Sequence, residues 1–246
     1  MFTSVDNIWL FYLVLPVVAF LYAAIGHGGA SGYLALMVLF GFSPGHMKPT
    51  ALLLNLFVAG IAFIHYFRQG HFKGKLFLFF AIGSIPMAYL GGTCEIDVGL
   101  YKKILGVLLI IAIARMLIKP SEEKENKKLA WYQGIILGAL IGFFSGLIGI
   151  GGGIILTPVI LLMHWGNMKQ AAAVSALFIW VNSGAGMLGL MSKGISIERE
   201  ASICVGIAVL GGFLGSYYGS RKLNNKTLSY LLAFVLVLAS IKLFFV

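Results

Sequence analysis

Apolar stretches follow one another along almost the whole chain, and several are long enough to cross a lipid bilayer as a helix, which takes about 20 residues. The sequence predicts ten segments, at 8–25, 33–42, 49–67, 76–93, 104–118, 131–148, 153–165, 171–191, 200–219 and 227–246. Apolar residues make up 60% of the chain and charged residues only 11%, against roughly 45–50% and 25% in a soluble domain. We therefore predict an all-α polytopic membrane protein with about 8–10 membrane segments.

The positions of the charged residues exclude other classes of protein. The net charge is +10, which alone could indicate a nucleic-acid partner. The Lys and Arg residues, however, fall in short loops between apolar runs, and all eight acidic residues lie in loops or at segment ends. A soluble enzyme, a disordered regulator and a nucleic-acid-binding protein are excluded by this pattern.

Two glycine clusters interrupt the apolar pattern. The first reads IGHGGASG over 25–32 and the second reads IGIGGG over 148–153. Each precedes a segment too short to span alone, so each predicts a helix that breaks and continues as a shorter helix. Broken backbone at membrane depth is tolerated only where it is buried in protein or lines a cavity. The two breaks are therefore the first places to look for function.

The chain is an internal duplication. A shift of 123 residues places Ile25, Gly26, Gly28 and Gly29 on Ile148, Gly149, Gly151 and Gly152, and a shift of 124 aligns three later Gly and Leu positions. We predict one transporter domain over 1–246, with repeat 1 at about 8–118, a charged cytoplasmic linker at 119–130 and repeat 2 at about 131–246. Neither repeat could bury its polar break alone, so the two form one domain.

The distribution of Lys and Arg favours inverted over parallel repeats. Five segments in each repeat would turn the second copy over, and 12 of the 18 Lys and Arg residues would then lie on the cytoplasmic side. If each glycine break instead lies within one crossing, the repeats run parallel and the division is 11 against 7. Because cytoplasmic loops carry an excess of Lys and Arg, we predict inversion, with both termini outside the cytoplasm.

The duplicated glycine cluster resembles a known family. The second cluster fits the pattern G-x-G-G-G-x-x-x-x-P with Gly149, Gly151, Gly152, Gly153 and Pro158. The first departs from it, because Ala30 and Ala35 stand where the second has Gly153 and Pro158. A duplicated membrane chain of this length with such clusters resembles the TauE/SafE family of sulfite and organosulfonate exporters. The resemblance implies transport of a small sulfur-containing anion across the cytoplasmic membrane, by export or by uptake.

The breaks predict an anion site by their own chemistry as well. In transporters with inverted repeats, half-helix N-termini near the bilayer midplane present free N–H groups and a positive dipole end to an anion. Because glycine lets a ligand approach the backbone, seven glycines are candidate substrate-binding residues: Gly26, Gly28, Gly29, Gly149, Gly151, Gly152 and Gly153. No charged residue lies deep in a predicted segment, so neutral donors would hold the anion and also let it leave.

Five polar side chains are further candidates for substrate binding: His27, Ser31, Asn55, Ser175 and Asn182. Ser145, Thr157 and Ser183 lie nearby in the sequence. Each has a plainer interpretation, because a serine in a membrane helix usually bonds to its own helix and an asparagine can join two helices. His27 is ionisable near neutral pH, so it could bind the anion when protonated or couple transport to protons. The alternative is a neutral imidazole bonded to a carbonyl; the second repeat has Ile150 at this position.

Several functions stay open at this point. We predict a secondary carrier that works by alternating access; the alternatives are an anion channel, a carrier of another small anion, and an intramembrane hydrolase using Ser145 and His164. The chain has no G-x-x-x-x-G-K-[ST] loop, so it does not hydrolyse ATP itself. No cofactor and no metal are predicted, since buried carboxylates and a Cys/His cluster are missing from the sequence pattern.

The expected partners are a small anionic substrate and membrane lipid, and the expected location is the inner (cytoplasmic) membrane. Two rows of glycines four residues apart predict close helix packing: Gly134, Gly138, Gly142 and Gly146, and Gly211, Gly215 and Gly219. These rows could join the two repeats or form the seam of a homodimer.

Overall fold

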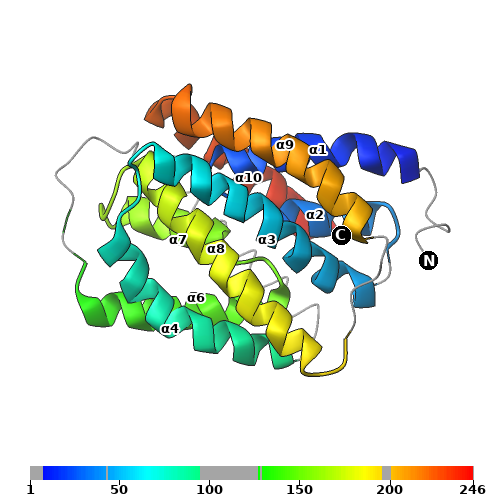
Figure 1. Ribbon diagram of the computed structural model, residues 1–246, viewed down its shortest axis with the longest axis horizontal. Coiled ribbons are helices and arrows are strands. Elements are labelled where there is room, and N and C mark those ends of the chain that lie inside the picture. Colours follow the sequence, from blue (N-terminus) through cyan, green and yellow to red (C-terminus); the bar gives the residue numbers. More distant parts are fainter. Residues whose placement is uncertain (1–7, 43, 95–126, 128, 196–200, 246) are drawn as a thin grey trace.

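A computed structural model describes residues 8–42, 44–94, 127, 129–195 and 201–245, and all regular structure in these ranges is helical. Figure 1 shows the nine helices of the described residues. They are α1 (Ile8–Ala24), α2 (Ala30–Leu39), α3 (Pro44–Arg68), α4 (Gly74–Thr93), α6 (Trp131–Ile148), α7 (Gly153–Leu162), α8 (Met168–Met191), α9 (Ala201–Arg221) and α10 (Asn225–Phe245). The all-α prediction is confirmed. The predicted segment 104–118 and most of the predicted linker lie outside the described residues.

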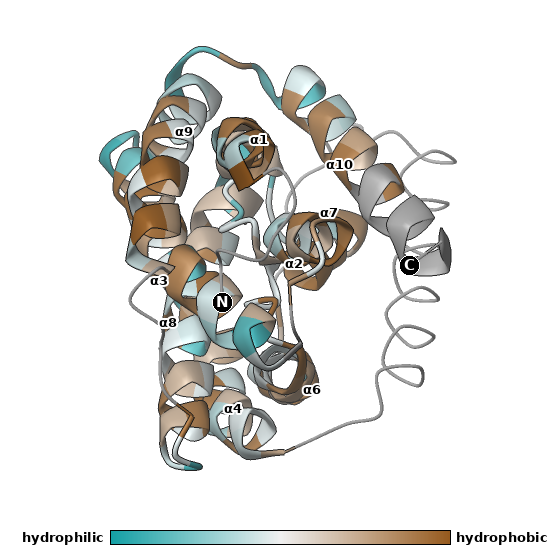
Figure 2. Ribbon diagram, turned by 90° about the vertical axis from the view of Figure 1, so that its right-hand side faces the viewer, coloured by the Kyte–Doolittle hydropathy of each residue, from teal (hydrophilic) through white to brown (hydrophobic). Residues whose placement is uncertain are grey.

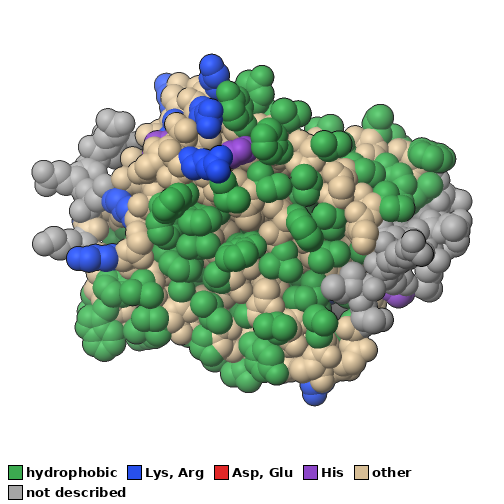
Figure 3. Space-filling model, in the orientation of Figure 1, with side chains coloured by type: hydrophobic (Ala, Val, Ile, Leu, Met, Phe, Trp, Pro, Cys, Tyr) green, Lys and Arg blue, Asp and Glu red, His purple; other side chains and the backbone are tan. Residues whose placement is uncertain are grey.

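Five of the described helices are long and apolar enough to cross a membrane: α3, α4, α6, α8 and α9. Large apolar side chains point outward along the bundle, among them Trp9, Leu13 and Leu210. In Figure 2 the hydrophilic colour concentrates at helix ends and connections. On the face shown in Figure 3, hydrophobic side chains are spread across the surface and Lys and Arg lie near its edges. An apolar exterior of this kind suits lipid, and the chain is a multi-pass membrane protein.

The helix boundaries differ from the predicted segments where local signals were overlooked. Helix α2 begins at Ala30, three residues before the predicted 33, whereas α7 begins at Gly153 as predicted; each begins directly after a glycine in the left-handed region. Helix α8 begins at Met168, three residues before the predicted 171. A capping box explains the earlier start, because Asn167 Oδ1 accepts from the Gln170 N–H and Gln170 Oε1 accepts from the Asn167 N–H, both at 3.0 Å.

The two most extensive helix–helix contacts each join a helix of one predicted repeat to a helix of the other. Helix α1 packs along α9, and α4 packs along α6, on opposite sides of the central pair α3 and α8 (Figure 1). In each outer pair, the first helix of one repeat lies on the fourth helix of the other. A Cβ atom at Gly211, Gly215 or Gly219 of α9 would overlap a backbone carbonyl oxygen of α1.

The glycine row of α6 packs in the same way. A Cβ atom at Gly138, Gly142 or Gly146 would overlap a carbonyl oxygen of α4, and one at Gly134 would lie 2.6 Å from the Phe79 Cβ. The rows on α6 and α9 thus join the two predicted repeats. Because these glycine faces are covered within one chain, they are not free to form the seam of a homodimer. Dimer formation through another surface stays a prediction.

Helices α3 and α8 run in opposite directions. Leu52, early in α3, clusters with Met187 and Leu190 late in α8, whereas Tyr66, late in α3, clusters with Ala172 early in α8. Equivalent helices of inverted repeats must oppose one another in this way. Inversion relative to the membrane stays a prediction that this geometry supports.

Candidate functional site

Both predicted breaks form, and left-handed backbone angles create them. In the first break Gly26 has φ 74° and Gly29 has φ 98°. In the second, Gly149, Gly151 and Gly152 have φ between 74° and 83°. An L side chain in this region costs roughly 1–2 kcal/mol, so glycine is required for the chain to leave one helix and enter the next within a few residues.

The two breaks converge on one side chain, Asn55 of α3. A Cβ atom built at Gly28 would overlap Asn55 Oδ1, and one built at Gly151 would lie 2.7 Å from Asn55 Nδ2. Ile179 of α8 contacts the same two glycines, at 3.0 Å from the Gly28 position and 2.6 Å from the Gly151 position. The central helices thus place one polar and one apolar side chain between the breaks.

Asn55 is fully buried and both ends of its amide are hydrogen-bonded to protein. Its Oδ1 accepts from the Ala30 N–H at 3.0 Å, which caps the first turn of α2 from a neighbouring helix. Its Nδ2 donates to Ser183 Oγ of α8 at 3.2 Å. Asn55 therefore connects the first break to both central helices.

His27 extends from the first break to the second. Its Nδ1 lies 3.1 Å from the Ile25 carbonyl oxygen, so the proton of the neutral ring is on Nδ1. Its Cδ2 lies 3.4 Å from the position of a Cβ on Gly153, the first residue of α7. The Nε2 atom is buried without a hydrogen-bond partner among the described residues. It can accept a hydrogen bond from a ligand, or donate one once the ring is protonated.

Ser145 faces the second break from α6. Its Cβ lies 3.3 Å from the position of a Cβ on Gly152, and its buried Oγ has no partner among the described residues. Two unpaired polar atoms, Ser145 Oγ of α6 and His27 Nε2 of the first break, therefore lie at the start of α7. Buried polar groups are rarely left unpaired unless they serve a ligand or water.

The other predicted residues lie in different surroundings. Gly26 packs against the Ala172 backbone, and Gly149 packs against the Lys48 side chain. Both glycines therefore let the breaks pack closely against neighbouring helices. Ser31 Oγ donates to Tyr22 Oη at 3.0 Å. These contacts are within the protein, and a substrate role for these three predicted residues has no geometric support beyond their position in the breaks.

Two predicted residues of α8 also have protein partners. Ser175 Oγ accepts from Thr157 Oγ1 at 2.7 Å, which ties α7 to α8. Asn182 Nδ2 donates to the Phe178 carbonyl of its own helix at 2.8 Å, as in the plainer interpretation of a buried asparagine. Asn182 Oδ1 is buried without a partner among the described residues, so this residue keeps one free acceptor.

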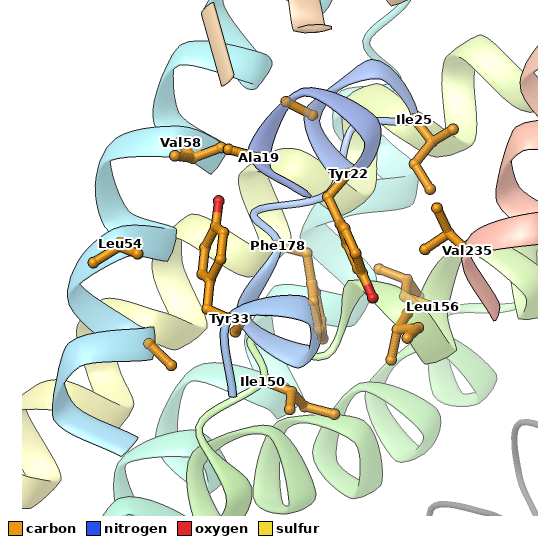
Figure 4. Close-up of a cluster of buried hydrophobic side chains, with 14 of the residues drawn as sticks. Ala19, Tyr22, Ile25, Tyr33, Leu54, Val58, Ile150, Leu156, Phe178 and Val235 are labelled. Carbon is orange, nitrogen blue, oxygen red and sulfur yellow. The ribbon is translucent and has the colours of Figure 1, made fainter. Parts of the chain in front are cut away.

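Two residues beside the first break were missed by the sequence analysis. The buried Tyr33 Oη has no partner among the described residues, and it lies 2.6 Å from the position of a Cβ on Gly29. Figure 4 shows the Tyr33 ring beside Leu54 and Val58 of α3. The second residue, Tyr66, donates to the Ala24 carbonyl oxygen at 2.6 Å at the end of α1. A tyrosine in an apolar run looks the same in sequence whether its hydroxyl group forms hydrogen bonds or its ring only fills the core.

One end of the bundle gathers cations that the charge count assigned to the cytoplasm. Lys73 Nζ donates to the Trp165 carbonyl at 3.4 Å and Lys169 Nζ donates to the Ser220 carbonyl at 3.2 Å. Burial lowers the pKa of His71 in the α3–α4 loop, and the charge of Lys169 lowers it further. All eight acidic residues lie outside the described part of the chain. The described helices therefore present no carboxylate that would repel an anion.

The residues named for a hydrolase do not form a catalytic pair. Ser145 lies beside Gly152 at the start of α7, whereas His164 follows the end of that ten-residue helix. A helix of this length separates its ends by about 15 Å. Within the described ranges, no three His, Cys, Asp or Glu side chains gather as a metal site would require.

Comparison with known proteins places nearly all of the chain in one family. The family model described as "Sulfite exporter TauE/SafE" matches residues 11–243. A "Probable membrane transporter protein y4hK" of Sinorhizobium fredii is 36% identical over 232 residues, covering 92% of this chain and 94% of that protein. "Probable membrane transporter protein YunE" of Bacillus subtilis is 26% identical, with 80% and 79% covered. "Probable membrane transporter protein MJ0441" of Methanocaldococcus jannaschii is 29% identical, with 74% of each chain covered. No solved structure matches the chain.

Proposed function

Because the chain belongs to the TauE/SafE sulfite exporter family, we propose that this membrane transporter is a secondary carrier for a small sulfur-containing anion. Sulfite, thiosulfate and small organosulfonates are the candidate substrates, and the cytoplasmic membrane is the proposed location. The family description supports the substrate class. The relatives carry only the word transporter in their names, so the substrate itself is our proposal.

The convergence of the two glycine breaks at Asn55 carries the proposal. It brings the starts of two short helices, α2 and α7, to one place between the central helices. Helix N-termini bind anions through free N–H groups and the helix dipole. Neutral donors hold an anion without a fixed counter-charge, which suits a carrier that must also release it.

Alternating access would expose this place to each side in turn. The glycine contacts lock α1 to α9 and α4 to α6, so each pair would move as a rigid unit past the central helices. We propose that the moving units are these helix pairs, each of which contains one helix from either repeat. Inverted repeats, supported by the opposed directions of α3 and α8, provide the two equivalent end states.

Proton coupling through His27 is part of the proposal. Because Nδ1 faces the Ile25 carbonyl, Nε2 of the neutral ring is an acceptor and would oppose the oxygen atoms of an anion. Protonation turns Nε2 into a donor. Binding of an anion at this atom would therefore take up one proton, and release would return it.

Uptake into proteoliposomes tests the proposal. The purified chain is expected to move sulfite, thiosulfate or sulfoacetate with saturation, and to discriminate against acetate and phosphate. Protein-free liposomes are the control. Uptake that stays linear with concentration would support the alternative of a channel, and preference for acetate or phosphate would refute the sulfur-anion assignment while leaving a carrier of another anion.

A further inference from the structure

The two breaks look equivalent in sequence, but their short helices begin differently. Ala30 and Gly153 are the first residues of α2 and α7, and they are 123 residues apart. Asn55 and Ile179, which contact both Gly28 and Gly151, are 124 residues apart. These offsets are the ones that relate the two repeats. Asn55 and Ile179 are therefore equivalent positions, one polar and one apolar.

The first N–H of α2 is capped by the protein itself, and the hydrogen bonds of the helix then begin with the Tyr33 N–H to the Gly29 carbonyl. Asn55 Oδ1 accepts the hydrogen bond of the Ala30 N–H, so an oxygen atom already occupies the place where an anion would bind. A Cβ at Gly28 would overlap that oxygen atom, which shows how closely the amide fills the turn. An anion at α2 would have to displace a buried hydrogen bond.

The start of α7 has no such cap. The N-cap residue, Gly152, has no side chain that could accept a hydrogen bond. Ile179 lies against Gly153, with its Cγ1 2.7 Å from the position of a Cβ on that glycine. The Ile179 side chain has no polar atom and cannot cap the helix. Among the described residues, hydrogen bonds of the first turn begin with the Ile155 N–H to the Gly152 carbonyl. The N–H groups of Gly153 and Ile154 are thus left for another acceptor.

Two unpaired side chains mark the same place. His27 is 2% exposed and Ser145 is fully buried. Neither His27 Nε2 nor Ser145 Oγ has a hydrogen-bond partner in the described part of the chain. His27 reaches Gly153 from the first repeat and Ser145 reaches Gly152 from α6. An oxyanion at the start of α7 would accept from the backbone N–H groups, the serine hydroxyl and a protonated imidazole.

We infer that the carrier has a single oxyanion site at the start of α7, in the position that Asn55 Oδ1 fills at the start of α2. The inference rests on the proposed function and deepens it, because it places the anion at one of the two breaks only. At the other break, the Asn55 amide oxygen occupies the position that the anion would take. The anion is small and carries several oxygen atoms on one centre, as sulfite does. His27 and Ser145 then contact the substrate, whereas Asn55 positions α2.

Supplying the missing cap tests the inference. In Ile179→Asn, an amide oxygen at the equivalent position would cap α7 and compete with the anion. The readout is the increase in thermal unfolding temperature that sulfite causes in detergent-solubilised protein. We expect about fivefold or greater loss of apparent affinity, since an N-terminal cap is worth about 1 kcal/mol or more. Met191→Asn, which places the same side chain at the exposed end of α8, is expected to respond as the native protein does.

Hydrogen exchange of the native protein gives a measurement that needs no variant. Sulfite is expected to protect the backbone amides of residues 152–156 and to leave those of 29–33 unchanged. Equal protection of both breaks, or an undiminished sulfite response in a folded Ile179→Asn protein, would overturn the one-sided site and leave the carrier proposal standing. If the native protein neither binds nor transports sulfite, thiosulfate or sulfoacetate, both proposals fail.

Discussion

Asn55 and Ala30 are 25 residues apart in sequence, yet the Asn55 amide oxygen caps the Ala30 N–H at 3.0 Å. The amide nitrogen of the same side chain donates to Ser183 of the other predicted repeat. A buried side chain with both ends paired is costly to replace, because its partners are left without water. This one residue holds the first break, α3 and α8 together.

Replacing Asn55 by alanine is therefore expected to destabilise the protein by about 1–3 kcal/mol, since it leaves a buried N–H and a buried hydroxyl unpaired. The measurement is the thermal unfolding temperature in detergent. Thr93→Ala is the control, because the Thr93 hydroxyl bonds only to its own helix at an exposed site. An unfolding temperature of Asn55→Ala equal to that of Thr93→Ala would show that the cap contributes nothing.

The glycine contact between α9 and α1 offers a matched pair of substitutions. A Cβ at Gly215 would overlap the Phe20 carbonyl oxygen, whereas one at Gly206 of the same helix meets nothing within 4 Å. Gly215→Ala must push α1 and α9 apart and is expected to lower stability by about 1–3 kcal/mol.

Gly206→Ala is expected to be neutral or to raise stability by up to about 1 kcal/mol, because alanine favours the helix over glycine. Thermal unfolding of both variants checks the pair. Equal effects would mean that the glycine row does not set the distance between the two helices.

Much of this fold could be predicted from the sequence because its signals are local. Runs of apolar residues give the helices, and glycine clusters give the breaks whatever lies around them. The role of Asn55 could not be predicted, because its partners lie 25 and 128 residues away. No sequence feature marks Ile179 as a functional residue. Its importance is seen only by comparison with Asn55, the equivalent residue of the other repeat, which caps α2.

Crowding at the second break can be separated from backbone strain. Gly151 and Gly194 have nearly the same φ, 74° and 78°, so alanine is strained at either position, by roughly 1–2 kcal/mol. Only at Gly151 would the new Cβ meet Asn55 and Ile179; at Gly194 it meets nothing. Gly151→Ala is expected to abolish uptake in proteoliposomes, and Gly194→Ala to retain it. Loss of uptake in both would assign the effect to strain alone.

Acid is expected to destabilise the protein through His71. Burial and Lys169 hold its pKa below the ordinary 6.5, so the folded state prefers the neutral ring. This contribution is fully present above the unfolded pKa and is lost as pH falls toward the folded pKa. We expect the unfolding temperature to drop on acidification from about pH 7.5 to about pH 5.5, and to drop less in His71→Gln. An identical drop in both proteins would exclude His71 as a cause.

His27 gives the test of coupling. Its Nδ1 is turned to the Ile25 carbonyl and its Nε2 is unpaired beside α7, so only a protonated ring can donate to an anion there. Glutamine keeps a donor but cannot titrate. We expect His27→Gln to transport with a rate that no longer changes with pH, while its unfolding temperature stays near that of the native protein.

His164→Asn is the control for this substitution. His164 follows α7 with φ 56°, a conformation that asparagine tolerates, and it lies at the far end of the helix from the proposed site. Its pH profile of uptake should match that of the native protein. A native-like profile in His27→Gln would show that the proton is carried elsewhere, and the imidazole would then be a structural group bonded to the end of α1.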